Sequence, residues 1–130
     1  MVVGVIVFAL VVIFSPRAHA RDAGQWEGSN HEIRQWFESL MQPDQPTISC
    51  CGEADAYWAD KIQVEGEKVF AIITDDRPDG PLRRPHIPVG TKIEVPPWKL
   101  KFDRGNPSGH AVIFLSTTRQ VYCFVQSSGI

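Results

Sequence analysis

Three cysteines constrain this chain more than any other feature: the adjacent pair Cys50 and Cys51, and a single late residue, Cys123. A bridge from the pair to Cys123 closes a loop of about 72 residues and stabilises the fold by roughly 4 kcal/mol in the chain-entropy model. A bridge between Cys50 and Cys51 themselves is geometrically strained and is not expected. We therefore predict either Cys51–Cys123 or Cys50–Cys123, and the sequence does not decide between them.

A stable disulfide requires an oxidising compartment, and the N-terminus predicts one. An apolar run over residues 2–14 is followed by Ala18-His19-Ala20, which has the small-x-small form of a signal peptidase site. The run is well short of the roughly 20 residues that span a bilayer as a helix. We predict a signal peptide at residues 1–20, a secreted or periplasmic protein, and no stable membrane span after cleavage. Since no Lys or Arg precedes the run, retention as a membrane anchor is the alternative.

The remaining chain is long enough for one compact domain, which we place at residues 29–126 between a flexible arm at 21–28 and a tail at 127–130. The net charge of the full chain is -2. Acidic residues predominate up to Asp76 and basic residues predominate from Arg77 onward. The halves either neutralise each other across the fold or present a basic face to an anionic partner.

One amphipathic helix is predicted near the start of the domain. Ser29 and Glu32 have capping-box spacing, and Pro43 cannot continue a helix beyond Gln42. One helical face collects the apolar residues Ile33, Trp36, Phe37, Leu40 and Met41. This stripe predicts a helix packed over the domain core.

The rest of the domain has strand-like periodicity. We predict strands at 57–64, 68–74, 91–95, 98–102, 111–115 and 121–125, with a hairpin around Gly66 and another closing the domain. Alternation of Trp98, Leu100 and Phe102 with Lys99 and Lys101 indicates a half-buried edge strand guarded by charges. The predicted fold class is α+β: a small bent antiparallel sheet or partial barrel of about five or six short strands, covered by the N-terminal amphipathic helix.

Residues 75–88 form the longest break in the pattern. Four prolines, at 78, 81, 85 and 88, exclude a central strand or a helix. We predict a long exposed loop, a kind of segment that in small domains is often functional.

Several short motifs together resemble a group of short bacterial secreted proteins of unknown function that carry a Cys-Cys pair and one late Cys. They are Trp36-Phe37-x-x-Leu40, Cys50-Cys51-x-x-Ala54-Asp55, Val95-Pro96, Asn106-Pro107-x-Gly109 and Val121-Tyr122-Cys123-Phe124. Many members have Ser after the pair, where this chain has Gly52. The resemblance implies an envelope or extracellular setting and carries over no catalytic or binding residue.

Enzymatic chemistry has one set of candidates, Cys50 or Cys51 as nucleophile and His110 as base, an order faintly similar to secreted NlpC/P60-type peptidases. No Cys-x-x-Cys or His-x-x-x-His spacing indicates a metal, and no cofactor is expected. The alternative from a third class is a structural or interaction protein whose odd cysteine pairs between chains.

The favoured hypothesis is a non-enzymatic binding module for an anionic polymer or glycan of the cell envelope. Arginine grips phosphate or carboxylate bidentately, and an aromatic ring offers a stacking face. Nucleic acid is not the expected partner, and the sequence leaves the oligomeric state open. The predicted binding residues are Arg77, Arg83, Arg84, His86, Trp98, Lys99, Lys101 and Arg104.

Overall fold

A computed structural model describes residues 31–127 of the chain. The predicted signal peptide at 1–20, the arm at 21–28, the Ser29 cap and the tail beyond Ser127 lie outside these residues. Across residues 31–127, no helix is long and apolar enough to cross a membrane. The elements in chain order are α1 (His31–Ser39), β1 (Asp55–Trp58), β2 (Lys61–Glu65), β3 (Lys68–Ile72), α2 (Asp79–Leu82), β4 (Lys92–Val95), η1 (Pro97–Lys99), β5 (Leu100–Asp103), β6 (Val112–Leu115) and β7 (Val121–Ser127).

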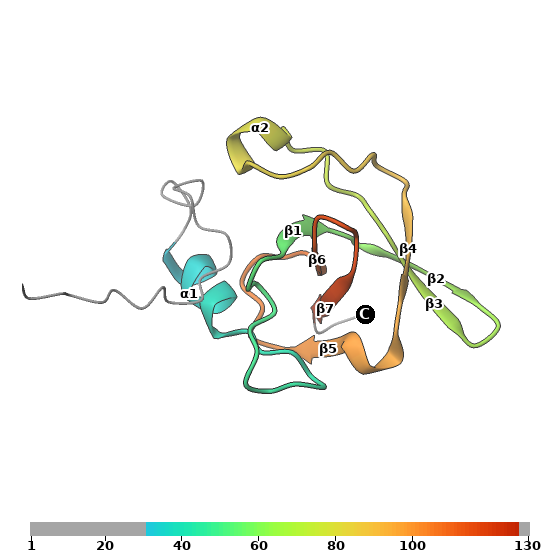
Figure 1. The fold of residues 1–130 in the computed structure, drawn as a ribbon, viewed down its shortest axis with the longest axis horizontal. Coiled ribbons are helices and arrows are strands. Elements are labelled where there is room, and N and C mark those ends of the chain that lie inside the picture. Colours follow the sequence, from blue (N-terminus) through green and yellow to red (C-terminus); the bar gives the residue numbers. More distant parts are fainter. Residues whose placement is uncertain (1–30, 128–130) are drawn as a thin grey trace, which may run out of the picture.

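The strands form two separate sheets (Figure 1). The first has four strands in the order β1-β6-β7-β5, and the second has three in the order β2-β3-β4. All pairs are antiparallel except β5 with β7, which run parallel. The hairpin of β2 and β3 extends away from the rest of the fold in Figure 1. Both predicted hairpins are therefore present, but they belong to different sheets.

The four-stranded sheet is covered on both faces, because successive residues of a strand point to opposite sides. One face meets the three-stranded sheet through buried residues such as Ile113 and Phe124, packed with Ala71 and Val95. The opposite face carries Val112, Phe114, Cys123 and Val125. Two buried layers thus lie on either side of one central sheet.

The second layer is closed by α1 together with residues 40–54. Trp36 and Phe37 are the buried residues of α1, and the ring of Phe37 meets that of Phe114 edge-on with centroids 5.7 Å apart. Leu40 and Cys51 complete the layer from the following segment. The helix has only nine residues, so it contacts one part of the sheet and does not cover the domain.

The predicted α+β fold class is wrong: the protein has seven strands in two sheets and one helix longer than a single turn among residues 31–127. The predicted strand at 57–64 is broken at Ala59 and Asp60, and its two parts enter different sheets. The Asp60 carboxylate accepts a hydrogen bond from the Ala111 backbone N–H at 2.8 Å, which holds the chain where it leaves β1. Periodicity alone cannot show such a break, because each part keeps a strand-like pattern.

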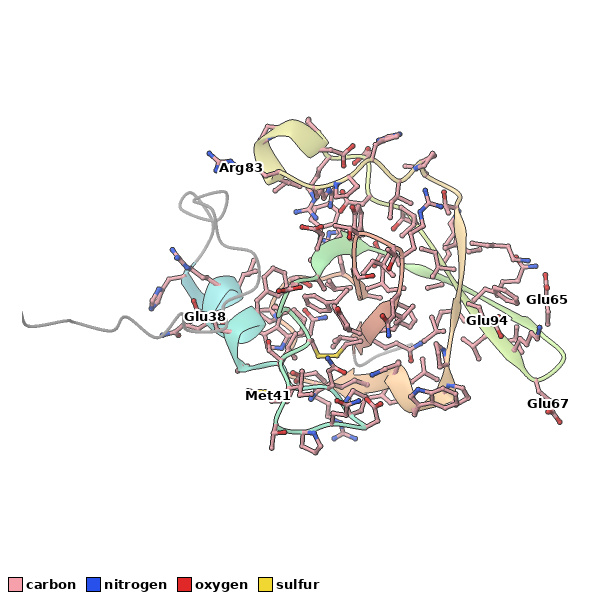
Figure 2. All side chains as sticks on the ribbon, in the orientation of Figure 1. Glu38, Met41, Glu65, Glu67, Arg83 and Glu94 are labelled. Carbon is pink, nitrogen blue, oxygen red and sulfur yellow. A yellow bond between two sulfur atoms is a disulfide. The ribbon has the colours of Figure 1, made fainter. Side chains whose placement is uncertain are left out.

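The predicted disulfide is present, and it joins Cys50 to Cys123 with Cα atoms 5.4 Å apart across 73 positions of sequence. Cys50 lies in the segment after α1 and Cys123 in the central strand β7, so the bridge ties the outer layer to the middle of the sheet. Figure 2 draws it as a yellow bond near the centre of the molecule.

Candidate functional site

Two lysines on the η1–β5 segment contact residues 41–44, one of them buried. Lys99 is 7% exposed, and its Nζ donates to Gln42 Oε1 and Asp44 Oδ1, both at 2.8 Å. The hydrogen bond from Lys99 lowers the pKa of Asp44. Lys101 Nζ donates to the backbone oxygen of Met41 at 2.9 Å. The segment is therefore fastened to residues 41–44 by two ammonium groups.

The aromatic residues of the same segment turn outward. Trp98 is 61% exposed and Phe102 is 74% exposed, although most large apolar side chains of the described part are buried. The predicted edge with buried aromatics and exposed lysine guards is thus wrong for Trp98, Phe102 and Lys99. Trp98 and Phe102 are four positions apart along the chain, so their Cα atoms lie at most about 14 Å apart. We call Trp98 and Phe102 the aromatic edge.

A second cluster of polar side chains fixes residues 75–88, around a buried carboxylate. Asp75 Oδ2 lies 2.6 Å from Arg77 Nη2 and 2.8 Å from Arg84 Nη1. Arg84 Nη1 also donates to the carbonyl oxygen of Ala56, which belongs to β1. Burial by itself would raise the pKa of Asp75, but the hydrogen bonds from Arg77 and Arg84 outweigh it and lower that pKa. Both arginines are therefore used in holding this segment to the sheet.

The cluster continues through Asp79 to the surface. Asp79 Oδ1 accepts from Arg84 Nε at 2.9 Å, and its Oδ2 lies 2.6 Å from His86 Nδ1. Burial opposes ionisation of Asp79, but hydrogen bonds from His86 and Arg84 lower its pKa. Since Asp79 also begins α2, the predicted exposed loop contains one helical turn and a buried arginine. Pro81 is tolerated in this turn because the first N–H groups of a helix have no intrahelical acceptor.

A stack of flat groups joins this cluster to His110, two positions before β6. The guanidinium of Arg77 lies 3.8 Å from the ring centroid of Trp58, and the imidazole of His110 lies 3.7 Å from it with an interplanar angle of 10°. Two groups this close to one indole cannot share a face, so they lie on opposite sides of it. His110 Nδ1 is in turn 2.8 Å from Asp60 Oδ2.

The eight predicted binding residues fall into two groups on opposite sides of the fold, since α2 and β5 are far apart in Figure 1. Arg77, Arg84 and His86 belong to the cluster around Asp75 and Asp79. Arg83 is exposed and points away from α2 in Figure 2. The other group lies on or beside η1 and β5: Trp98, Lys99, Lys101 and Arg104.

The predicted catalytic set is not brought together. Cys50 is bonded to Cys123, and Cys51 is the free cysteine, fully buried, with its Sγ 3.2 Å from the carbonyl oxygen of Phe37. Burial raises the pKa of the Cys51 thiol, with a smaller contribution from the charge of Glu38, so the thiolate is disfavoured. His110 is bound to Asp60 instead. A buried Cys51 also offers no thiol for pairing between chains.

Sequence reasoning missed the acidic and aromatic partners. Three carboxylates, those of Asp60, Asp75 and Asp79, hold the basic side chains in place through ion pairs. The ring of Trp58 contacts two of these basic side chains, Arg77 and His110. The one available signal was the closeness of Asp75 and Asp79 to Arg77, Arg83 and Arg84 within a segment rich in proline, which is compatible with internal ion pairs. No group of three or more His, Cys, Asp or Glu among residues 31–127 has the arrangement of a metal site.

No family model matches the chain, and neither a curated protein nor a solved structure matches it.

Proposed function

We propose that this chain is an exported binding module that takes a glycan on the aromatic edge, with Trp98 and Phe102 as stacking rings. One observation carries the proposal: these two side chains are 61% and 74% exposed on a segment whose lysines are hydrogen-bonded to residues 41–44. Contiguous exposed apolar surface often marks a binding site, and an aromatic ring offers a large apolar face to a ligand.

The geometry favours a ligand with flat apolar faces. Rings on a preorganised backbone lose little conformational entropy on binding, because aromatic side chains have only two rotatable bonds. A span of at most about 14 Å between Cα atoms suits a chain of a few linked sugar rings. Sugar C–H groups carry partial positive charge and are attracted to the negative face of an aromatic ring.

Charge next to the aromatic edge favours an anionic glycan over a neutral one. Arg104 is exposed and follows β5 directly. Lys101 donates to the Met41 carbonyl oxygen at 2.9 Å, and an ammonium has three donors, so it keeps capacity for a further acceptor. Along the chain, Lys101 is adjacent to Phe102 and Arg104 is two positions beyond it, so a carboxylate or phosphate group on the sugar would find cations beside the aromatic edge. The basic cluster at α2 is a weaker candidate, since Arg77 and Arg84 already have carboxylate partners.

Export is part of the proposal. The Cys50–Cys123 bridge is compatible with an oxidising compartment, and no spanning helix is present in residues 31–127. The small-x-small motif at residues 18–20 supports cleavage of a leader.

Titration of tryptophan fluorescence with two probes tests the proposal: alginate oligosaccharides as an anionic glycan and N-acetylglucosamine oligomers as a neutral one. We expect Trp98→Ala and Phe102→Ala each to weaken binding about tenfold or more. Since Trp98→Ala removes a fluorophore, calorimetry gives its affinity. Arg104→Gln should weaken alginate binding alone.

Val89→Ala is the matched control, because Val89 is a similarly exposed apolar residue, at 59%, outside η1 and β5. It should bind as the wild type does. Unchanged affinity in the Trp98→Ala/Phe102→Ala double variant, or no binding of either probe by the wild type, would contradict the proposal.

A further inference from the structure

Among residues 31–127, nothing pairs with the outer edge of β2. β2 pairs with β3 on one side only, and all five of its residues are exposed. The hairpin carries this edge away from the body of the molecule, with Glu65 and Glu67 near its tip in Figure 2. An unpaired edge strand is a template for another strand, and proteins usually protect it with charges, a proline or a bulge. In β2 the charges stand only at the two ends, at Lys61 and Glu65, and the three residues between them include no charge and no proline.

The hairpin fixes which backbone groups point outward. Glu65 pairs with Lys68 across a two-residue turn in which Gly66 has φ +62°, so the backbone groups of Glu65 face β3. Pairing alternates along an antiparallel strand. Gln63 and Lys61 therefore also face β3, whereas the N–H and C=O groups of Ile62 and Val64 face the open edge. Among residues 31–127 these outward groups have no backbone partner.

We propose that β2 pairs antiparallel with β2 of a second copy, about a twofold axis through Gln63. In this register Ile62 of one copy faces Val64 of the other, so the outward backbone groups of both residues meet. Lys61 of one copy faces Glu65 of the other, at both ends of the pair. The result is one continuous sheet that runs from β4 of one copy to β4 of the other.

The charges of β2 are complementary to those of a second β2 that runs antiparallel to it, which is why a second copy is the partner. A twofold contact places each residue of the patch against its counterpart, so opposite charges at the two ends of a strand attract. Lys61 and Glu65 satisfy this condition, and the charges stand two positions from the central Gln63 on either side. Glu65 also contacts Lys92 within its own chain at 2.5 Å, but both groups are well exposed, so a further cation can approach the carboxylate.

Apolar side chains support the same contact. Ile62 and Val64 are 39% and 66% exposed, on the face that continues inward through Ala71 and Ile93. Pairing across the axis would bring both residues against their counterparts and remove apolar surface from water. The contact extends the buried face of the sheet beyond the core.

Charge reversal followed by mixing tests the proposal by analytical ultracentrifugation of the full protein. Lys61→Glu alone and Glu65→Lys alone each create like charges at both ends of the dimer and should weaken it about tenfold or more. A mixture of the two variants restores opposite charges at both ends, so it should form a mixed dimer with close to wild-type affinity. A fold defect in either variant would not be repaired by mixing.

Glu94→Lys is the matched control, since Glu94 lies in β4 of the same sheet, which β3 separates from β2. It should dimerise as the wild type does. A wild type that remains monomeric at about 1 mM, or variants that fail to associate when mixed, would overturn the proposal. Aromatic-edge variants should leave the dimer intact, which separates this test from that of glycan binding.

Discussion

Arg84 donates to Asp75 at 2.8 Å in a place where both side chains are almost completely shielded from water, at 2% and 0% exposed. Asp75 follows β3 and Arg84 follows α2, so the pair closes the segment between them onto itself. The second contact of Arg84 Nη1, with the Ala56 carbonyl oxygen, fixes the closed segment to β1. Residues 75–88 are therefore held in their conformation by ion pairs among their own side chains.

Loss of the arginine should be costly. Arg84→Met keeps most of the side-chain volume but leaves Asp75 buried with Arg77 as its remaining cation. Removing one partner of a buried pair typically costs about 3–5 kcal/mol. We expect a decrease of about 3 kcal/mol in the free energy of unfolding, measured by urea denaturation.

Arg83→Gln serves as the control for this substitution, because Arg83 is adjacent and exposed. Its backbone is left-handed, a conformation that Arg and Gln tolerate equally. Its effect should stay within about 0.5 kcal/mol. Equal effects of the two substitutions would show that the buried pair contributes nothing.

Acid should weaken the same contact. The pKa of Asp75 is lower in the folded protein than in the unfolded chain, although burial alone would raise it, because Arg77 and Arg84 donate to it. Its contribution to stability is therefore complete above the unfolded pKa of about 4 and is lost as the pH falls toward the folded pKa. The stability difference between wild type and Asp75→Asn should shrink steadily below about pH 4.

Urea denaturation at several pH values measures this difference. Asp76→Asn, an exposed neighbour, controls for the change of one net charge. A wild-type advantage over Asp75→Asn that persists unchanged down to about pH 2 would rule out the ion pairs as its cause.

The two neighbouring cysteines should behave very differently. Cys123→Ala opens the bridge and should lower the free energy of unfolding by roughly 4 kcal/mol. Cys51→Ala keeps the bridge and removes only a buried thiol, which should cost about 1 kcal/mol. Since burial raises the pKa of Cys51, its thiol should react with a labelling reagent only after unfolding. Rapid labelling of the native wild type would contradict the buried position.

Fastening of the aromatic edge can be tested at Lys99. Lys99→Met removes hydrogen bonds to Gln42 and Asp44, and bonds to a charged group contribute about 1.5–3 kcal/mol. We expect a loss of about 2 kcal/mol in stability, and weaker glycan binding because Trp98 is adjacent. Lys92→Met removes an exposed pair with Glu65 and a contact with the Phe70 ring, and should cost less than about 1 kcal/mol. A reversed order of the two variants would mean that Lys99 does not anchor the segment.

Local features of the sequence predicted the parts of the fold that depend on near neighbours. The apolar stripe predicted α1, and its residues Trp36 and Phe37 are indeed buried. The Gly66 turn predicted the first hairpin, where φ is positive. These predictions succeed because helix periodicity and turn conformation are set within a few residues.

Predictions that depend on distant partners were incomplete or wrong. The direction of Lys99 depends on Gln42, 57 positions away, and its sequence neighbours favour the opposite orientation. The basic residues at 77 and 84 were expected on a free surface, yet their carboxylate partners hold them in the structure.

The sequence by itself predicted that an early cysteine bridges to Cys123, because Cys123 is the single cysteine outside the adjacent pair, and that two hairpins form, because turn geometry is a local property. Only the tertiary structure decided that Cys50 makes the bridge, that the strands divide into two sheets, and that Trp98 and Phe102 face outward. Every strand offers the same backbone donors and acceptors, so its backbone does not specify the strand with which it pairs. Which edges meet, and which side chains then lie inside, is settled only when all segments pack together.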